Sequence, residues 1–271
     1  MWIKLGLREI GPVTLVAFRV SFGLLFGIIA VLIIRIKLPC TIKEWAPLFI
    51  LGLTNLAIPF FLISWGEKSI DSSVAAILDA TVPLFTILIA HFLLKDDKMT
   101  IPKIAGLLIG FAGVIVLLSK DIGSSSSSLL GQAAVVFASV SYAGSAVYVR
   151  RKTQEVHGIL RSAGPMLSAS FVMWIMVLLS ENPIQIPKLE ITWIALLFLG
   201  IIGSGVAFVL AFYLIHEIGP TKTTMVTYIF PLGGIILGIV FLHENITWQL
   251  IAGGFLIVIS LVGANWHHVQ N

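Results

Sequence analysis

The stretch that decides the fold is residues 72–94, SSVAAILDATVPLFTILIAHFLL. It is long enough to cross a bilayer as a helix, because a span needs about 20 predominantly apolar residues. Near its middle it carries a carboxylate, Asp79, and a proline, Pro83. Both are costly inside a membrane helix, so the stretch is a candidate functional segment as well as a span.

The same pattern recurs 148 positions further along the chain. Residues 221–242, TKTTMVTYIFPLGGIILGIVFL, place Pro231 at the position of Pro83 and Thr227 at that of Asp79. The same shift carries Gly52 to Gly200, Trp65 to Tyr213, Asp96 to Glu244 and Gly106 to Gly254. One constant offset over this distance indicates a duplicated membrane unit.

Composition excludes a soluble core. The 271 residues are 58% hydrophobic and 11% charged, whereas a soluble domain carries about 25% charged residues. The single cysteine, Cys40, excludes an internal disulfide and a cysteine zinc cluster. Neither a P-loop nor a metallopeptidase or hydrolase motif is present, so we expect no cofactor, no metal and no enzymatic activity. The basic residues lie in short loops, which favours membrane orientation over nucleic-acid binding.

The chain predicts an all-α polytopic membrane protein. Apolar runs of spanning length lie near 13–34, 45–66, 72–94, 101–119, 129–150, 160–180, 192–216, 221–242 and 247–266. Residues 1–10 are too short to span, so we interpret them as the end of a truncated first helix. The expected domains are a first repeat at 1–122, a flexible Ser-rich linker at 123–128 and a second repeat at 129–271. We therefore expect two repeats of five helices each, in which the first helix is truncated and the other nine span the membrane.

Five helices is an odd number, so the second repeat must be inverted relative to the first. With the first helix starting in the cytoplasm, eleven Lys and Arg residues fall in cytoplasmic loops and four on the opposite side. This bias fits the positive-inside rule. We therefore predict a multi-pass protein of the plasma (inner) membrane with a cytoplasmic C-terminus.

Inverted repeats are typical of alternating-access transporters, whose substrate site lies near the midplane between repeats. Asp79 is the leading candidate, because it can bind an amino group or carry a proton. The alternatives are a structural pair with Arg19 or a polar contact at a helix end. Pro83 and Pro231 are candidate hinges, since each removes a helical hydrogen bond to the carbonyl one turn earlier.

Arg19 and Asn55 are further polar candidates within predicted spans. Arg19 can hold a substrate carboxylate, or its head group can snorkel to the surface. Asn55 shares a predicted helix with Ser64 and is a weaker candidate.

Four aromatic residues complete the candidate substrate site. Trp65 and Tyr213 correspond under the repeat and lie near span ends, where such side chains often anchor a protein at the membrane interface. Tyr142 and Tyr228 lie deeper and are better candidates for a cavity wall.

Three glycine pairs with four-residue spacing, Gly23 and Gly27, Gly106 and Gly110, and Gly234 and Gly238, indicate tight helix crossings. They predict either packing within the chain or a homodimer surface.

At this point the chain resembles the drug/metabolite transporter superfamily, in particular its EamA-type ten-helix members. The resemblance is carried by a lysine-bearing first helix followed by Gly11-Pro12 and the Arg19 helix, by AAILDATVPLF at 75–85, by YIFPL at 228–232, and by LHENITWQ at 242–249 followed by Gly253-Gly254. The first helix is incomplete, and Asp96 stands where that family usually has Glu. The resemblance implies an inner-membrane carrier, often an exporter of amino acids or related metabolites, with a central cavity lined by both halves.

Two functional hypotheses follow. The first is a secondary transporter, with export the expected direction, of small amphipathic metabolites such as amino acids, with the lipid bilayer as its setting. The alternative is a non-transporting membrane subunit that binds a partner or acts as a sensor through its glycine faces.

Overall fold

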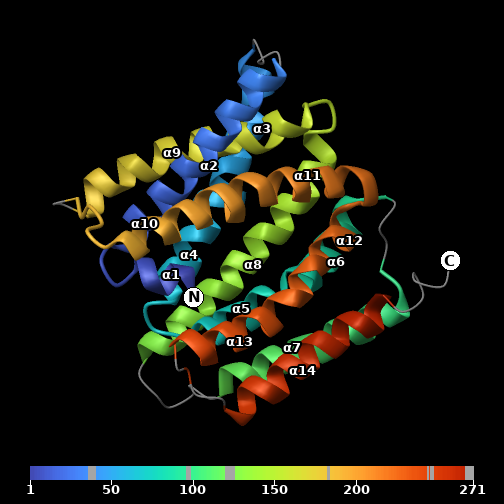
Figure 1. The fold of residues 1–271 in the computed structure, drawn as a ribbon. Coiled ribbons are helices and arrows are strands. Elements are labelled where there is room, and N and C mark those ends of the chain that lie inside the picture. The colour runs from blue at the N-terminus through green and yellow to red at the C-terminus, as the bar shows by residue number, and fades with distance from the viewer. Residues whose placement is uncertain are drawn as a thin grey trace. The chain divides into compact units, whose positions relative to one another are not determined.

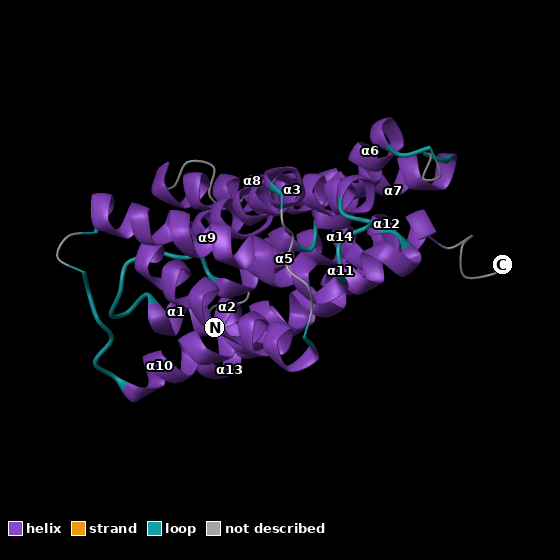
Figure 2. Ribbon diagram, turned by 90° about the horizontal axis from the view of Figure 1, so that it is seen from above, coloured by secondary structure: helices purple, strands orange, loops and turns teal. Residues whose placement is uncertain are grey.

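The structure is a computed structural model that describes residues 1–35, 41–95, 99–119, 126–181, 184–242, 244 and 247–265. Every regular element within these ranges is helical (Figure 2). The elements are α1 (Trp2–Gly6), α2 (Pro12–Ile34), α3 (Ile42–Leu51), η1 (Gly52–Ala57), α4 (Ile58–Gly66), α5 (Ser72–Asp79), α6 (Val82–Leu93), α7 (Ile101–Leu118), α8 (Ser126–Lys152), α9 (Gly158–Ser180), α10 (Glu190–Leu197), η3 (Phe198–Val206), α11 (Ala207–Ile218), α12 (Pro220–Thr224), η4 (Met225–Tyr228), α13 (Ile229–Leu242) and α14 (Trp248–Asn265).

Every predicted span coincides with a helix or a run of consecutive helical segments. Six helical stretches in the described ranges are long and apolar enough to cross a membrane, and three shorter apolar helices accompany them. The all-α polytopic fold class is therefore confirmed. Of the predicted linker, residues 123–125 lie outside the described residues, and residues 126–128 form the first turn of α8.

The helices form two compact units that do not follow the sequence repeats. Unit 1 contains Met1, Trp65–Val147 and Pro220–Asn271, and unit 2 contains Trp2–Ser64 and Tyr148–Gly219. Each unit therefore combines helices from both repeats.

In unit 2, the repeat-related helices α2 and α9 run antiparallel. The start of α2 contacts the residue after the end of α9, because Val13 N–H donates to Glu181 Oε1 at 3.0 Å. Further along α2, Ser21 Oγ lies 2.8 Å from Ser170 Oγ. Gly27 lies against Ala163, near the start of α9. As the residue number rises along α2, the partner's number falls along α9, which is the signature of inverted repeats.

Unit 1 shows the same relation in two further pairs. Helices α7 and α14 lie side by side (Figure 1), with Gly110 against Ser260 and Gly113 against the Gly253 carbonyl. When the truncated first helix is counted, the fourth span (residues 72–94) and the ninth (residues 221–242) also run antiparallel, since α5 packs against α13 while α6 packs against α12.

The predicted glycine crossings are used inside the chain. Gly23 lies against Met166 and Ser204, and Gly27 against Ala163. On α13, Gly234 lies against Ala76 of α5. A side chain at any of these positions would force neighbouring backbones apart, which explains why small residues recur there.

Candidate functional site

The fourth span is broken directly after Asp79. Helix α5 ends at this residue, Ala80 and Thr81 form a turn, and α6 begins at Val82. Pro83 is the second residue of α6, where its missing N–H removes no helical hydrogen bond. Asp79 Oδ1 is buried. Pro83 thus lies in the first turn of the second half-helix, α6, and Asp79 is the last residue of the first half-helix, α5.

The Leu78 carbonyl holds this break in shape. It accepts hydrogen bonds from Thr81 Oγ1 at 2.6 Å, from the Thr81 N–H at 3.1 Å and from Ser139 Oγ of α8 at 3.1 Å. A carbonyl released from the helical pattern must find donors inside a bilayer. Two hydroxyl groups supply them here.

The ninth span is interrupted at the corresponding position. Helix α12 gives way to the 3₁₀ turn η4, which contains Thr227, and α13 follows. The Thr227 hydroxyl donates to the Thr224 carbonyl at 2.8 Å, as the Thr81 hydroxyl does to Leu78. Pro231 is the third residue of α13.

The two interruptions lie at one crossing within unit 1. Helix α6 packs against both α12 and η4, and α5 packs against α13. Asp79 and Thr227 therefore belong to adjoining irregular segments, each from a different repeat. Tyr142 of α8 is half-buried in the same unit. The side chain of Tyr228 lies outside the described residues, as does Asp96.

Arg19 lies in the interior of unit 2. Its side chain is 9% exposed, which argues against snorkelling to the surface. The Nε atom donates to Ser204 Oγ at 2.9 Å, and Nη2 lies 3.5 Å from the Gly203 carbonyl oxygen. The guanidinium carbon lies 3.5 Å from the centroid of the Phe60 ring. Aromatic stacking and two polar contacts fix the orientation of this cation.

The residues that hold Arg19 belong to two repeat-related spans with π-helical segments. These segments are η1 in the third span and η3 in the eighth. Segment η1 contains Gly52 and η3 contains Gly200, two glycines that the 148-residue offset pairs. A side chain at Gly52 would collide with Ser168 of α9, and one at Gly200 with Phe22 of α2. π-Helical segments often occur at functional sites.

Asn55 lies within η1 and is 4% exposed. Its Nδ2 atom and Ser64 Oγ are buried and have no hydrogen-bond partner among the described residues. A buried donor without a partner costs about 1–3 kcal/mol. These two groups are therefore candidates for contact with water or a ligand.

Trp65 and Tyr213 are exposed, at 39% and 57%, whereas the other candidates whose side chains the structure describes are buried or half-buried. Trp65 belongs to unit 1 and Tyr213 to unit 2. Exposure is compatible with interfacial anchoring and with a cavity wall, so both interpretations of this pair stand. Within the described ranges, no group of three His, Cys, Asp or Glu side chains is placed to hold a metal ion.

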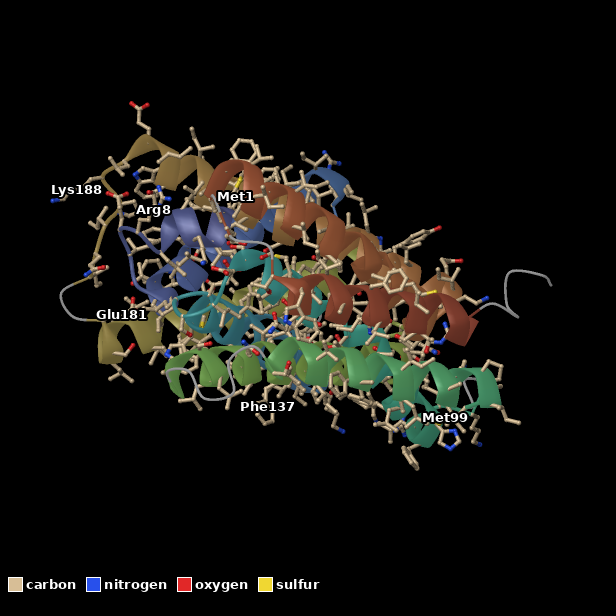
Figure 3. The ribbon with its side chains drawn as sticks, turned by 90° about the horizontal axis from the view of Figure 1, so that it is seen from below. Met1, Arg8, Met99, Phe137, Glu181 and Lys188 are labelled. Carbon is tan, nitrogen blue, oxygen red and sulfur yellow. The ribbon has the colours of Figure 1, made fainter. Side chains whose placement is uncertain are left out.

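Three loop carboxylates were missed by the sequence interpretation. Glu181 binds the first turn of α2 in unit 2, and Glu244 binds the first turn of α5 in unit 1. Glu9 accepts hydrogen bonds from the N–H groups of Lys188 and Leu189, before α10. Figure 3 shows Arg8, Glu181 and Lys188 at the same end of unit 2. The sequence does contain a signal for Glu244, because an acidic residue lies 13 positions after Pro83 and 13 positions after Pro231.

Comparison with known proteins agrees with this architecture. The model of the EamA-like transporter family matches residues 1–119 and 129–266. The uncharacterized transporter YoaV of Bacillus subtilis is 26% identical over 263 residues, covering 94% of this chain and 88% of its own. The uncharacterized inner membrane transporter YedA of Escherichia coli K12 is 30% identical over 241 residues, covering 87% and 76%. A solved structure described as the crystal structure of a protein has a TM-score of 0.74 at 22% identity, covering 98% and 93%.

Proposed function

Because this chain belongs to the EamA-like transporter family and is a multi-pass membrane transporter, we propose that it moves small amphipathic metabolites such as amino acids by alternating access. Export across the plasma membrane is the proposed direction. The C-terminus is proposed to lie in the cytoplasm.

The observation that carries the proposal is the pair of broken spans in unit 1. A broken helix places backbone carbonyl and N–H groups in the membrane interior, where they can bind a ligand. The two breaks come from oppositely oriented repeats and adjoin one another through α6 and η4. A ligand bound there would contact both repeats, which is the arrangement that alternating access requires.

The charged groups favour a substrate with an amino group. Asp79 ends α5 at the break, where a carboxylate can bind an ammonium group. In the proposed site, Thr227, Tyr142 and Tyr228 supply polar and aromatic wall contacts. Within unit 2, considered separately, Arg19 and Asn55 present N–H donors in a buried setting, and we propose them as contacts for anionic or polar groups. Trp65 in unit 1 and Tyr213 in unit 2 are each proposed as an aromatic substrate contact within its own unit.

Uptake into proteoliposomes tests the proposal. Vesicles containing the purified protein are compared with empty vesicles for entry of labelled amino acids, with and without a pH gradient. We expect saturable entry of at least one amino acid, reduced at least tenfold by Asp79→Ala. Glu155→Gln is the matched control, because this carboxylate is exposed in the α8–α9 loop. Absence of flux for the whole panel, or equal loss in both variants, contradicts the proposal.

The partner-binding alternative rests on glycine faces that are open to another chain. Gly23, Gly27 and Gly234 instead pack against helices of the same chain. This observation favours transport over a subunit role.

A further inference from the structure

Two loop carboxylates of the second repeat each bind the first turn of a helix from the first repeat. Glu244 Oε1 accepts a hydrogen bond from the Ser72 N–H at 2.7 Å, and Oε2 accepts one from the Ser73 N–H at 3.0 Å and one from Ser73 Oγ at 2.7 Å. Glu181 makes the equivalent pair with the Val13 and Thr14 N–H groups, at 3.0 and 2.9 Å. A carboxylate at this position satisfies orphan donors and opposes the positive end of the helix dipole.

The two helices that these carboxylates bind differ in one respect. Helix α2 continues without interruption for 23 residues. Helix α5 has eight residues and ends at Asp79. Its last hydrogen bonds are those of the turn, from the Ala80 N–H to the Ala76 carbonyl and from the Thr81 N–H to the Leu78 carbonyl. An eight-residue helix is too short to cross the bilayer by itself, so the position of α5 depends on its contacts with neighbouring segments.

Helix α5 also contacts α13 and α14, Glu67 through Ser72 Oγ, and Ser139 of α8 through the Leu78 carbonyl. Helix α5 lies on the glycine face of α13, with Ala76 against Gly234. The Glu244 carboxylate occupies the space beside Gly238 that a side chain there would fill. The Glu244 N–H donates to the Gly238 carbonyl at 3.1 Å. Glu244 is thus attached to α13 through its backbone N–H and to α5 through its carboxylate.

We propose that Glu244 is a positioning residue that fixes the half-helix α5 as one body, and through it Asp79. The carboxylate holds one end of α5, and Asp79 is the residue at the other end. Movement of Asp79 during a transport cycle therefore requires the Glu244 contacts to shift or break. Glu181 holds a continuous helix and has no such consequence. The role of Glu244 in transport rests on the proposed function, whereas its hold on α5 does not.

Amide hydrogen exchange of the full chain in lipid nanodiscs tests the structural part without any ligand. In Glu244→Gln, the neutral amide loses the charge and one acceptor oxygen, so we expect at least tenfold faster exchange from Ser72 to Ala80. Exchange in α6 stays unchanged, because the break separates the two half-helices. In the matched control, Glu181→Gln, faster exchange is confined to the first turn of α2. Acceleration only at Ser72 and Ser73, or acceleration that continues into α6, overturns the proposal.

Transport kinetics in proteoliposomes test the functional part, with the labelled amino acid that shows the highest flux. Glu244→Gln lowers the maximal rate at least fivefold, and Glu244→Asp restores at least half of it. In a double-mutant cycle, Glu244→Gln and Asp79→Asn have strongly non-additive effects, while Glu181→Gln and Asp79→Asn are additive. Additivity in both cycles refutes coupling through α5. Absence of flux in the unmodified protein refutes the proposed function alone, and the exchange result then stands separately.

Discussion

Gly27→Ala offers a direct test of the α2–α9 crossing. A Cβ atom at Gly27 would lie 2.7 Å from Ala163 Cβ and 3.2 Å from Ala163 Cα. Carbon atoms in contact lie about 3.5–4.0 Å apart, so the two helices must separate by about 1 Å. Ala163 has no flexible side chain that can move aside. Overpacking of this kind costs about 1–3 kcal/mol.

The substitution also has a favourable effect, because alanine stabilises a helix by about 1 kcal/mol relative to glycine. Gly144→Ala isolates that effect, since a Cβ at Gly144 of α8 meets nothing within 4 Å. We therefore expect Gly144→Ala to be neutral or stabilising. Gly27→Ala should be less stable than Gly144→Ala by about 1–3 kcal/mol, the difference that overpacking alone produces.

The assay is thermal unfolding of the purified protein in detergent, followed by fluorescence-detected size exclusion. A midpoint of Gly27→Ala several degrees below that of Gly144→Ala is the expected result. Equal midpoints would show that α2 and α9 are not held at this distance, and the Gly27–Ala163 contact would no longer support the antiparallel pairing.

Three further outcomes are expected. Asp79→Asn should abolish any stimulation of transport by a pH gradient, measured in proteoliposomes with and without an imposed gradient, and retention of full stimulation would exclude Asp79 as the proton carrier. Arg19→Lys should lower the thermal midpoint, because an ammonium group cannot stack on Phe60 while donating to Ser204 and Gly203. We expect the free energy of unfolding to fall by about 1–3 kcal/mol. An unchanged midpoint would show that these contacts do not stabilise the protein. A phosphatase reporter fused after residue 271 should be inactive and a fluorescent one active, as the predicted cytoplasmic C-terminus requires, and the reverse pattern would invert the topology.

The spans could be predicted because their signal is local. An apolar run of about 20 residues specifies a membrane helix whatever its neighbours are. The internal repeat then predicted the inversion, since five helices per repeat leave no other orientation. The breaks at Asp79 and Thr227 were also accessible, because Pro83 and Pro231 mark the half-helices that follow them.

Other features could not be predicted, because their causes lie far apart in the sequence. The Glu181 and Glu244 contacts join residues more than 160 positions apart. The sequence around either glutamate does not predict which helix it contacts. The π-helical segments could not be predicted from the sequence for a different reason. A nearly uniform apolar stretch has no polar face, so a change of helical period leaves no trace in its pattern. Each compact unit contains helices from both repeats. Which helices it contains likewise depends on tertiary contacts alone.

The four irregular segments described above each carry a hydroxyl-to-carbonyl contact of the kind that also occurs in the regular helices, as at Thr86 and Ser260. Each contains a hydroxyl side chain that donates to a backbone carbonyl three to five residues earlier: Thr54 to Ile50, Thr81 to Leu78, Ser204 to Leu199 and Thr227 to Thr224. Carbonyls that leave the α-helical pattern within a membrane need donors to replace the helical ones. Two of the segments are repeat-related breaks in unit 1, and two are repeat-related π-helical segments in unit 2. Irregular backbone inside a membrane is costly, so its recurrence at corresponding places of the two repeats argues for a shared purpose.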